Sequence, residues 1–176
     1  LAPRWAALYD LRGDLPMEPL IVHWPYLVPF TIAFMGAFIT EIPLMRQLRR
    51  WVNQSSQQDA RSTWMLIIGN QLSLCLGFAL AFEVPNAAIR SYRPILFIAG
   101  LTVVVAGIAL RRHCIHMLGR SFTGSIIVEP GQPLVTKGAY RWIRHPSYTA
   151  AMMIFLGFAL CLTNWLALIV VGTITM

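Results

Sequence analysis

Charged side chains are scarce in this sequence, and acidic ones are the scarcest. Asp, Glu, Lys and Arg make up 12% of its 176 residues, and apolar residues make up 57%, whereas about a quarter of an ordinary soluble domain is charged. Only 7 acidic residues oppose 14 basic ones, so the net charge is +7. This balance excludes an ordinary soluble domain and predicts an integral membrane protein, with the lipid bilayer as its partner.

Cysteine is also rare, and its spacing excludes two kinds of site. Cys75, Cys114 and Cys161 stand alone in the sequence, which predicts neither a disulfide framework nor a thiolate metal site. We expect all three to be packing residues. His113 and His116 are three residues apart, as a ligand pair on a helix can be, but a third ligand is not evident, so no metal is predicted.

Five apolar runs predict an all-α protein. They cover residues 20–40, 64–82, 94–110, 149–162 and 165–176. Because about 20 helical residues cross a bilayer core of about 30 Å, the first three runs predict transmembrane helices. The last two, which Thr163 and Asn164 separate, predict a tight helical hairpin. We therefore expect a polytopic bundle of about five transmembrane helices. The final run is short for a full crossing, and we expect the polypeptide to continue beyond Met176.

Basic segments at 46–61 and 111–144 indicate how the chain is oriented. Short loops rich in Arg and Lys stay in the cytoplasm, which predicts an N-terminus on the outside. Because these basic residues lie at the ends of apolar runs, they suit lipid headgroups, and no nucleic-acid partner is predicted. The expected organisation is an extracytoplasmic segment (1–19), three transmembrane helices (20–110), a cytosolic loop (111–148) and a transmembrane hairpin (149–176).

The most informative segment lies at the end of the second basic loop. Residues 134–148 read Leu-Val-Thr-Lys-Gly-Ala-Tyr-Arg-Trp-Ile-Arg-His-Pro-Ser-Tyr. Pro146 should exclude His145 from the α region and begin the next helix, so that the amides of Ser147 and Tyr148 face the basic loop and suit an anion. The arginines and aromatic rings suit a zwitterionic ligand. An interfacial belt of arginines and aromatic residues explains the same composition equally well.

Local signals around this segment predict its backbone. Residues 125–128 and 133–135 flank a Pro-Gly pair, which suits a type II turn, so a small extended hairpin is expected. Gly138 should let the backbone turn or approach another group closely. Residues 140–144 are expected to form a short helix that Pro146 ends.

The pattern Leu-Val-Thr-x-Gly-x-Tyr-x-x-x-Arg-His-Pro-x-Tyr over 134–148 resembles the signature of the isoprenylcysteine carboxyl methyltransferase family, including its prokaryotic homologues. Leu118, Gly119, Gly157 and the break at Asn164 also fall where that family's pattern puts them. The resemblance implies a multi-helix enzyme of a membrane, here the prokaryotic inner membrane. Such an enzyme transfers a methyl group from S-adenosylmethionine to a lipophilic acceptor, such as the carboxylate of an isoprenylcysteine.

The resemblance also implies a cofactor pocket on the cytosolic side. The residues that it places around S-adenosylmethionine are Gln132, Leu134, Val135, Gly138, Tyr140, His145, Pro146, Ser147 and Tyr148. Gln132 departs from the His that many relatives have at its position. The family also carries an Arg and paired glutamates after the hairpin, and we expect these beyond Met176.

Two residues of the motif are candidates for catalysis. A carboxylate acceptor is already ionised at neutral pH and needs no general base. Arg144, or else an arginine expected beyond Met176, would orient it electrostatically, and Arg144 is the first candidate. A thiol or amine acceptor would need a proton acceptor, and His145 is the nearest candidate. Direct displacement at the sulfonium methyl needs no metal.

Other functions remain open from the sequence. Related membrane methyltransferases act on phospholipid amines or small thiols, and the same fold can serve a non-catalytic scaffold or a reductase-like relative with a nicotinamide cofactor. Four polar residues in or beside the apolar runs are assigned no functional role: Glu41, Asn70, Gln71 and Glu83. Of these, Asn70 and Gln71 are expected to bond between helices.

Overall fold

We describe the protein from a computed structural model, which describes residues 18–52, 57–118 and 138–176. These ranges are helical and contain no strand. The elements in chain order are η2 (Leu20–Val22), α1 (Trp24–Val52), α2 (Gln57–Glu83), η3 (Pro85–Ala87), α3 (Arg93–Leu118), η5 (Gly138–Arg141), α4 (Pro146–Cys161) and α5 (Trp165–Thr175). The all-α prediction is confirmed for the described residues. The extended hairpin predicted around 125–135 lies outside them.

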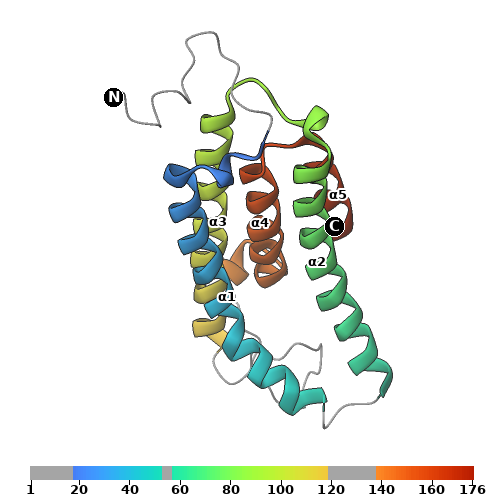
Figure 1. Ribbon diagram of the computed structural model, residues 1–176. Coiled ribbons are helices and arrows are strands. Elements are labelled where there is room, and N and C mark those ends of the chain that lie inside the picture. Colours follow the sequence, from blue (N-terminus) through green and yellow to red (C-terminus); the bar gives the residue numbers. More distant parts are fainter. Residues whose placement is uncertain (1–17, 53–56, 119–137) are drawn as a thin grey trace.

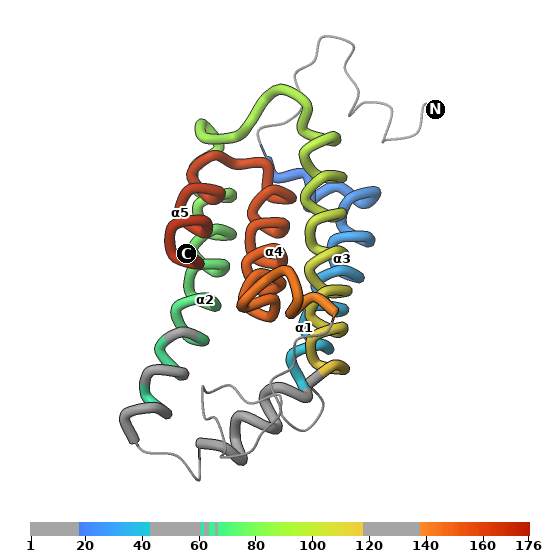
Figure 2. Tube along the Cα trace, turned by 180° about the vertical axis from the view of Figure 1, so that it is seen from behind, coloured from blue at the N-terminus to red at the C-terminus, as the bar shows by residue number. Residues whose placement is uncertain are grey.

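The helices form a bundle in which α4 lies between α3 and α2 (Figure 1). The view from behind shows the same neighbours, with α3 beside α4 and α5 beside α2 (Figure 2). The starts of α1 and α3 and the end of α4 meet at one end of the bundle, the upper end in Figure 1. The motif therefore lies toward the opposite end, where α3 ends and α4 begins.

Two of the described helices are long and apolar enough to cross a membrane: Trp24–Ile42 within α1 and Arg93–Met117 within α3. The other apolar helical stretches are shorter, namely Ile67–Glu83, Pro146–Cys161 and Trp165–Thr175. Five helices are thus confirmed, whereas a full crossing by each of them stays a prediction. The polar loop expected at 46–61 is wrong in extent, since α1 continues to Val52 and α2 begins at Gln57. Leu, Arg and Gln, which dominate residues 44–52, favour a helix whether or not lipid surrounds it.

The predicted hairpin is confirmed, and Asn164 explains its tight turn. The Asn164 side-chain oxygen accepts hydrogen bonds from the amides of Leu166 and Ala167, at 3.0 and 3.1 Å, and so caps α5. Its amide nitrogen donates to the Val84 carbonyl at 3.1 Å, which ties the hairpin to the end of α2. Asn164 is buried, so each of these bonds replaces one to water.

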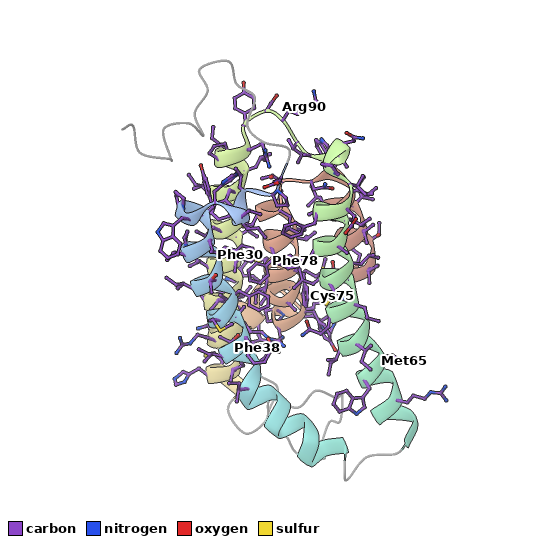
Figure 3. All side chains as sticks on the ribbon, viewed as in Figure 1. Phe30, Phe38, Met65, Cys75, Phe78 and Arg90 are labelled. Carbon is purple, nitrogen blue, oxygen red and sulfur yellow. The ribbon has the colours of Figure 1, made fainter. Side chains whose placement is uncertain are left out.

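Aromatic rings fill the middle of the bundle. Phe30 on α1 and Phe78 on α2 point toward each other, with ring centroids 5.9 Å apart (Figure 3). The Phe158 ring of α4 also contacts the Phe30 ring, with centroids 5.4 Å apart. Apolar side chains such as Ile32 and Met65, which are 67% and 63% exposed, cover the outer faces of α1 and α2. An exposed apolar surface of this kind suits a protein surrounded by lipid.

The cysteines only partly follow their predicted role. All three are free thiols, and Cys114 and Cys161 are buried as expected of packing residues. Cys75 is exposed on α2, so its interpretation as a packing residue is wrong (Figure 3). Because a helix turns by about 100° per residue, an apolar run alone does not tell which of its members face outward.

Candidate functional site

The start of α4 has the geometry that the sequence predicts. Pro146 occupies the first turn, and His145 precedes it with φ −130° and ψ 65°, outside the α region. The Thr149 amide donates to the His145 carbonyl at 3.1 Å, which makes His145 the N-cap. The next amides of such a helix start lie beyond its own hydrogen bonding and carry the positive end of the helix dipole. This terminus is therefore suited to an anionic group.

The turn before α4 is held against the end of α3. Gly138 has φ +62°, a conformation that favours glycine, and a Cβ there would lie 2.8 Å from His113 Nε2. Both the predicted turn and the predicted close approach at Gly138 are confirmed. The short helix expected at 140–144 is wrong in its bounds, because it is a 3-10 helix over Gly138–Arg141 that starts at this glycine.

Tyr140 connects the turn to α3 through a hydrogen bond between its hydroxyl and the Cys114 thiol. Burial raises the pKa of Tyr140 to about 12, with further contributions from Cys114. The phenol therefore stays neutral at physiological pH and acts as a hydrogen-bonding and apolar group.

This pKa gives a measurable prediction. The Tyr140 hydroxyl should ionise with a midpoint near 12 in the folded protein, so the difference in phenolate absorbance between the wild type and Tyr140→Phe should appear about two pH units above the value of about 10 for free tyrosine. Since the unfolded chain loses this proton first, Tyr140 stabilises the fold fully below pH 10 and progressively less from there to pH 12. In Cys114→Ala the midpoint should fall but stay above 10, because burial is the largest cause. A difference midpoint near 10 in the wild type would contradict the buried hydroxyl.

The other motif side chains form an open edge beside the start of α4. Arg144 and His145 are exposed, and Trp142 and Tyr148 are 82% and 58% exposed. The His145 and Tyr148 rings meet edge to face with centroids 6.0 Å apart. The Arg141 guanidinium carbon lies 5.4 Å from the centroid of the Trp142 ring. The structure thus brings His145 together with Tyr148, whereas Gln132, Leu134 and Val135 lie outside the described residues.

Three residues of different elements form a polar link that the sequence did not reveal. Arg111 of α3 donates from Nε to Glu41 Oε1 at 3.0 Å and from Nη2 to Glu41 Oε2 at 3.1 Å. Its Nη1 donates to the Ser147 carbonyl at 2.9 Å and also to the Ser147 hydroxyl. Arg111 therefore connects α1 directly to the first turn of α4.

An apolar cavity of about 510 Å³ adjoins this link. Four helices supply its walls, with aromatic residues Phe34 and Phe38 from α1 and Phe155 and Phe158 from α4. Its polar lining consists of Glu41, Asn70, Gln71 and Arg111. This volume is in the range of pockets that hold a small organic ligand, about 300–1,000 Å³. The cavity is suited to a molecule with a long apolar part and a polar end.

The cavity lining includes three polar residues to which the sequence assigned no functional role. Glu41, Asn70 and Gln71 all line the cavity, and Glu41 also contacts α3 through Arg111. The available signal was Glu41 itself, because an ionisable residue at the edge of an apolar run marks a functional site by default. The sequence did not single out its partner Arg111, because Arg111 is one of several basic residues in the second basic segment.

Comparisons with known proteins agree on one group of relatives. A model of the isoprenylcysteine carboxyl methyltransferase (ICMT) family matches residues 99–176. A probable protein-S-isoprenylcysteine O-methyltransferase of Oryza sativa subsp. indica is 30% identical over 105 residues, which cover 56% of this chain and 54% of the relative. Protein-S-isoprenylcysteine O-methyltransferase B of Arabidopsis thaliana is 40% identical over 67 residues, 37% of this chain and 34% of the relative.

A third relative extends further along the chain. The uncharacterized protein YpbQ of Bacillus subtilis (strain 168) is 27% identical over 132 residues, 74% of this chain and 52% of the relative. The chain thus spans about half the length or less of these curated relatives. No solved structure matches it.

Proposed function

Residues 99–176 belong to the isoprenylcysteine carboxyl methyltransferase family, and on that premise we propose that the protein is a membrane methyltransferase that uses S-adenosylmethionine and a lipophilic acceptor. The family resemblance of the motif is confirmed by the same match. The observation that carries the proposal is the position of the cavity. Arg111 both lines it and binds Ser147, and Ala151, one turn after Ser147, lines it as well. An acceptor in the cavity would therefore lie next to the motif.

The described part of the motif fits S-adenosylmethionine. The cofactor combines a carboxylate with a positive sulfonium. At the helix start, the free amides can bind the carboxylate, and the aromatic rings can hold the sulfonium. Tyr140, His145, Ser147 and Tyr148 are the described residues that would hold it. The Ser147 hydroxyl and carbonyl already accept from Arg111, so Ser147 would contact the cofactor through its amide. When bound, S-adenosylmethionine supplies the methyl group for direct displacement.

The acceptor side follows from the cavity lining. Its aromatic walls suit an isoprenoid or other aliphatic tail, which would bring the polar end of the acceptor toward the Glu41 and Arg111 end of the cavity. The protein's main contribution is to align the acceptor with the methyl donor away from water. We further propose the orientation that the basic loops predict, with the N-terminus outside and the motif on the cytosolic side.

Calorimetric titration of the purified protein in detergent with S-adenosylhomocysteine tests the cofactor assignment. We expect saturable binding to the wild type and weaker binding to Tyr148→Ala, which removes an exposed ring beside His145. Absence of binding to the wild type would refute the proposed function. Product assays with a prenylcysteine, an aminophospholipid and an alkyl thiol then distinguish the alternative acceptors.

Arg144→Ala tests the orienting role of the motif cation. If Arg144 aligns a carboxylate acceptor, kcat for that acceptor should fall about 100-fold, as for loss of one electrostatic contact to the reacting group. The matched control is Arg112→Ala, because Arg112 is another exposed arginine on this side of the bundle. Equal methyl transfer by both variants would show that Arg144 does not orient the acceptor. The cofactor assignment would be unaffected.

A further inference from the structure

Arg111 makes an unusual set of contacts for an arginine at the end of an apolar helix. Its guanidinium donates to both oxygens of the Glu41 carboxylate and to two oxygens of Ser147. An arginine side chain has five N–H donors in a rigid plane, so these bonds fix both its position and its orientation. The Arg111 side chain is only 10% exposed and that of Glu41 29%, so water screens the pair less than a surface pair.

The two partners of Arg111 belong to the two halves of the proposed site. Glu41 lines the cavity, where the acceptor would bind. Ser147 directly follows Pro146 in the first turn of α4, where the cofactor would bind. No covalent loop joins these halves over a short distance, since Glu41 and Ser147 are more than 100 residues apart in the chain. Arg111 contacts both halves directly.

We propose that Arg111 is a positioning residue, which holds the start of α4 in register with the polar end of the cavity through its bonds to Ser147 and Glu41. This inference rests on the proposed function for its catalytic consequence. Arg111 acts on the cofactor through Ser147 and on the acceptor through Glu41. Transfer between two bound molecules depends steeply on their alignment, so a shift of the α4 start should lower the rate even where both molecules still bind.

Arg111→Lys is the sharpest test, because it keeps the positive charge and removes the planar fork. A lysine ammonium is a point charge that does not bridge a carboxylate and two oxygens in fixed directions. We expect the Kd for S-adenosylhomocysteine to rise about tenfold, in keeping with the loss of charge-assisted hydrogen bonds, and kcat to fall by at least as much. Arg112→Lys is the matched control, since it makes the same substitution at the exposed neighbour and should change neither quantity.

Hydrogen–deuterium exchange supplies a measurement that does not depend on catalysis. The Thr149 amide, which donates to the His145 carbonyl at the start of α4, should exchange faster in Arg111→Lys than in Arg112→Lys, whereas amides in the middle of α4 should be unchanged. A folded Arg111→Lys protein with wild-type exchange, wild-type affinity and wild-type kcat would overturn the proposal. If the wild type neither binds S-adenosylhomocysteine nor transfers methyl groups, the proposed function fails, and the exchange comparison alone then decides whether Arg111 holds the start of α4.

Glu41→Gln replaces Arg111→Lys if the lysine variant does not fold. It keeps the volume of the side chain and one oxygen acceptor but removes the charge, so we expect a smaller change, about threefold in kcat. Glu83→Gln, at the exposed end of α2, is its control. A Glu41→Gln protein that matches Glu83→Gln in both kcat and amide exchange would overturn the proposal as well.

Discussion

Gly157→Ala is expected to destabilise the bundle, although it adds a single methyl group. A Cβ at Gly157 would lie 2.7 Å from Val104 Cγ2 and 2.8 Å from both the Gly100 carbonyl oxygen and the Val104 amide nitrogen. Two of these atoms belong to the backbone, so the clash is relieved only if α3 and α4 separate. Overpacking of this kind typically costs about 1–3 kcal/mol, and α3 with α4 is the most extensive helix pair of the described fold. The thermal unfolding midpoint in detergent should fall accordingly.

Gly69→Ala is the matched control, and it should raise the unfolding midpoint where Gly157→Ala lowers it. A Cβ at Gly69 meets nothing within 4 Å, so the substitution removes only backbone freedom and should stabilise α2 by about 0.5–1 kcal/mol. If both variants shifted the midpoint equally, the close crossing of α3 and α4 at Gly157 would be contradicted.

Ala37→Phe should abolish methyl transfer while cofactor binding persists. Ala37 lines the cavity from α1 together with Phe34 and Phe38, and a ring at this position would occupy the space that we assign to the acceptor tail. We expect kcat/KM for a prenylated acceptor to fall at least about 100-fold, because binding energy from a remote apolar tail contributes to the rate. The Kd for S-adenosylhomocysteine should stay within about twofold, because Ala37 belongs to α1 and not to the motif.

The control for the cavity is Ala99→Phe, which adds the same ring to an exposed position of α3. It should transfer methyl groups like the wild type, since position 99 faces away from the cavity lining. Undiminished transfer by Ala37→Phe would show that the acceptor binds elsewhere, without affecting the assignment of the cofactor.

The elements that depend on local sequence signals were the ones that the sequence predicted well. Pro146 and Asn164 mark the starts of α4 and α5, because a proline at the first turn and an asparagine cap act within a few residues. Gly138 lies in the predicted turn for the same reason, and it has a positive φ. The end of α1 was harder, because the change from apolar to polar residues near Arg46 does not end the helix, which continues to Val52.

The candidate site also has one part that the sequence predicted and another that it did not. The motif residues follow one another in the chain, so a pattern reveals them. The link between Glu41, Arg111 and Ser147 joins three helices, with separations of 70 residues from Glu41 to Arg111 and 36 from Arg111 to Ser147. A single sequence contains no signal for such a pairing, because it depends on how α1, α3 and α4 pack. The cavity is a product of that packing too, and the roles of Asn70 and Gln71 in its lining became visible only in the fold.

The most direct test of the account is transfer of a deuterated methyl group from S-adenosylmethionine to a farnesylated cysteine, followed by mass spectrometry, with the protein reconstituted in lipid vesicles. The account predicts a labelled methyl ester that forms with the wild type, is lost in Ala37→Phe and does not form when the acceptor carboxylate is already blocked as an ester. Binding of S-adenosylmethionine without transfer to the farnesylated cysteine, an aminophospholipid or an alkyl thiol would contradict it.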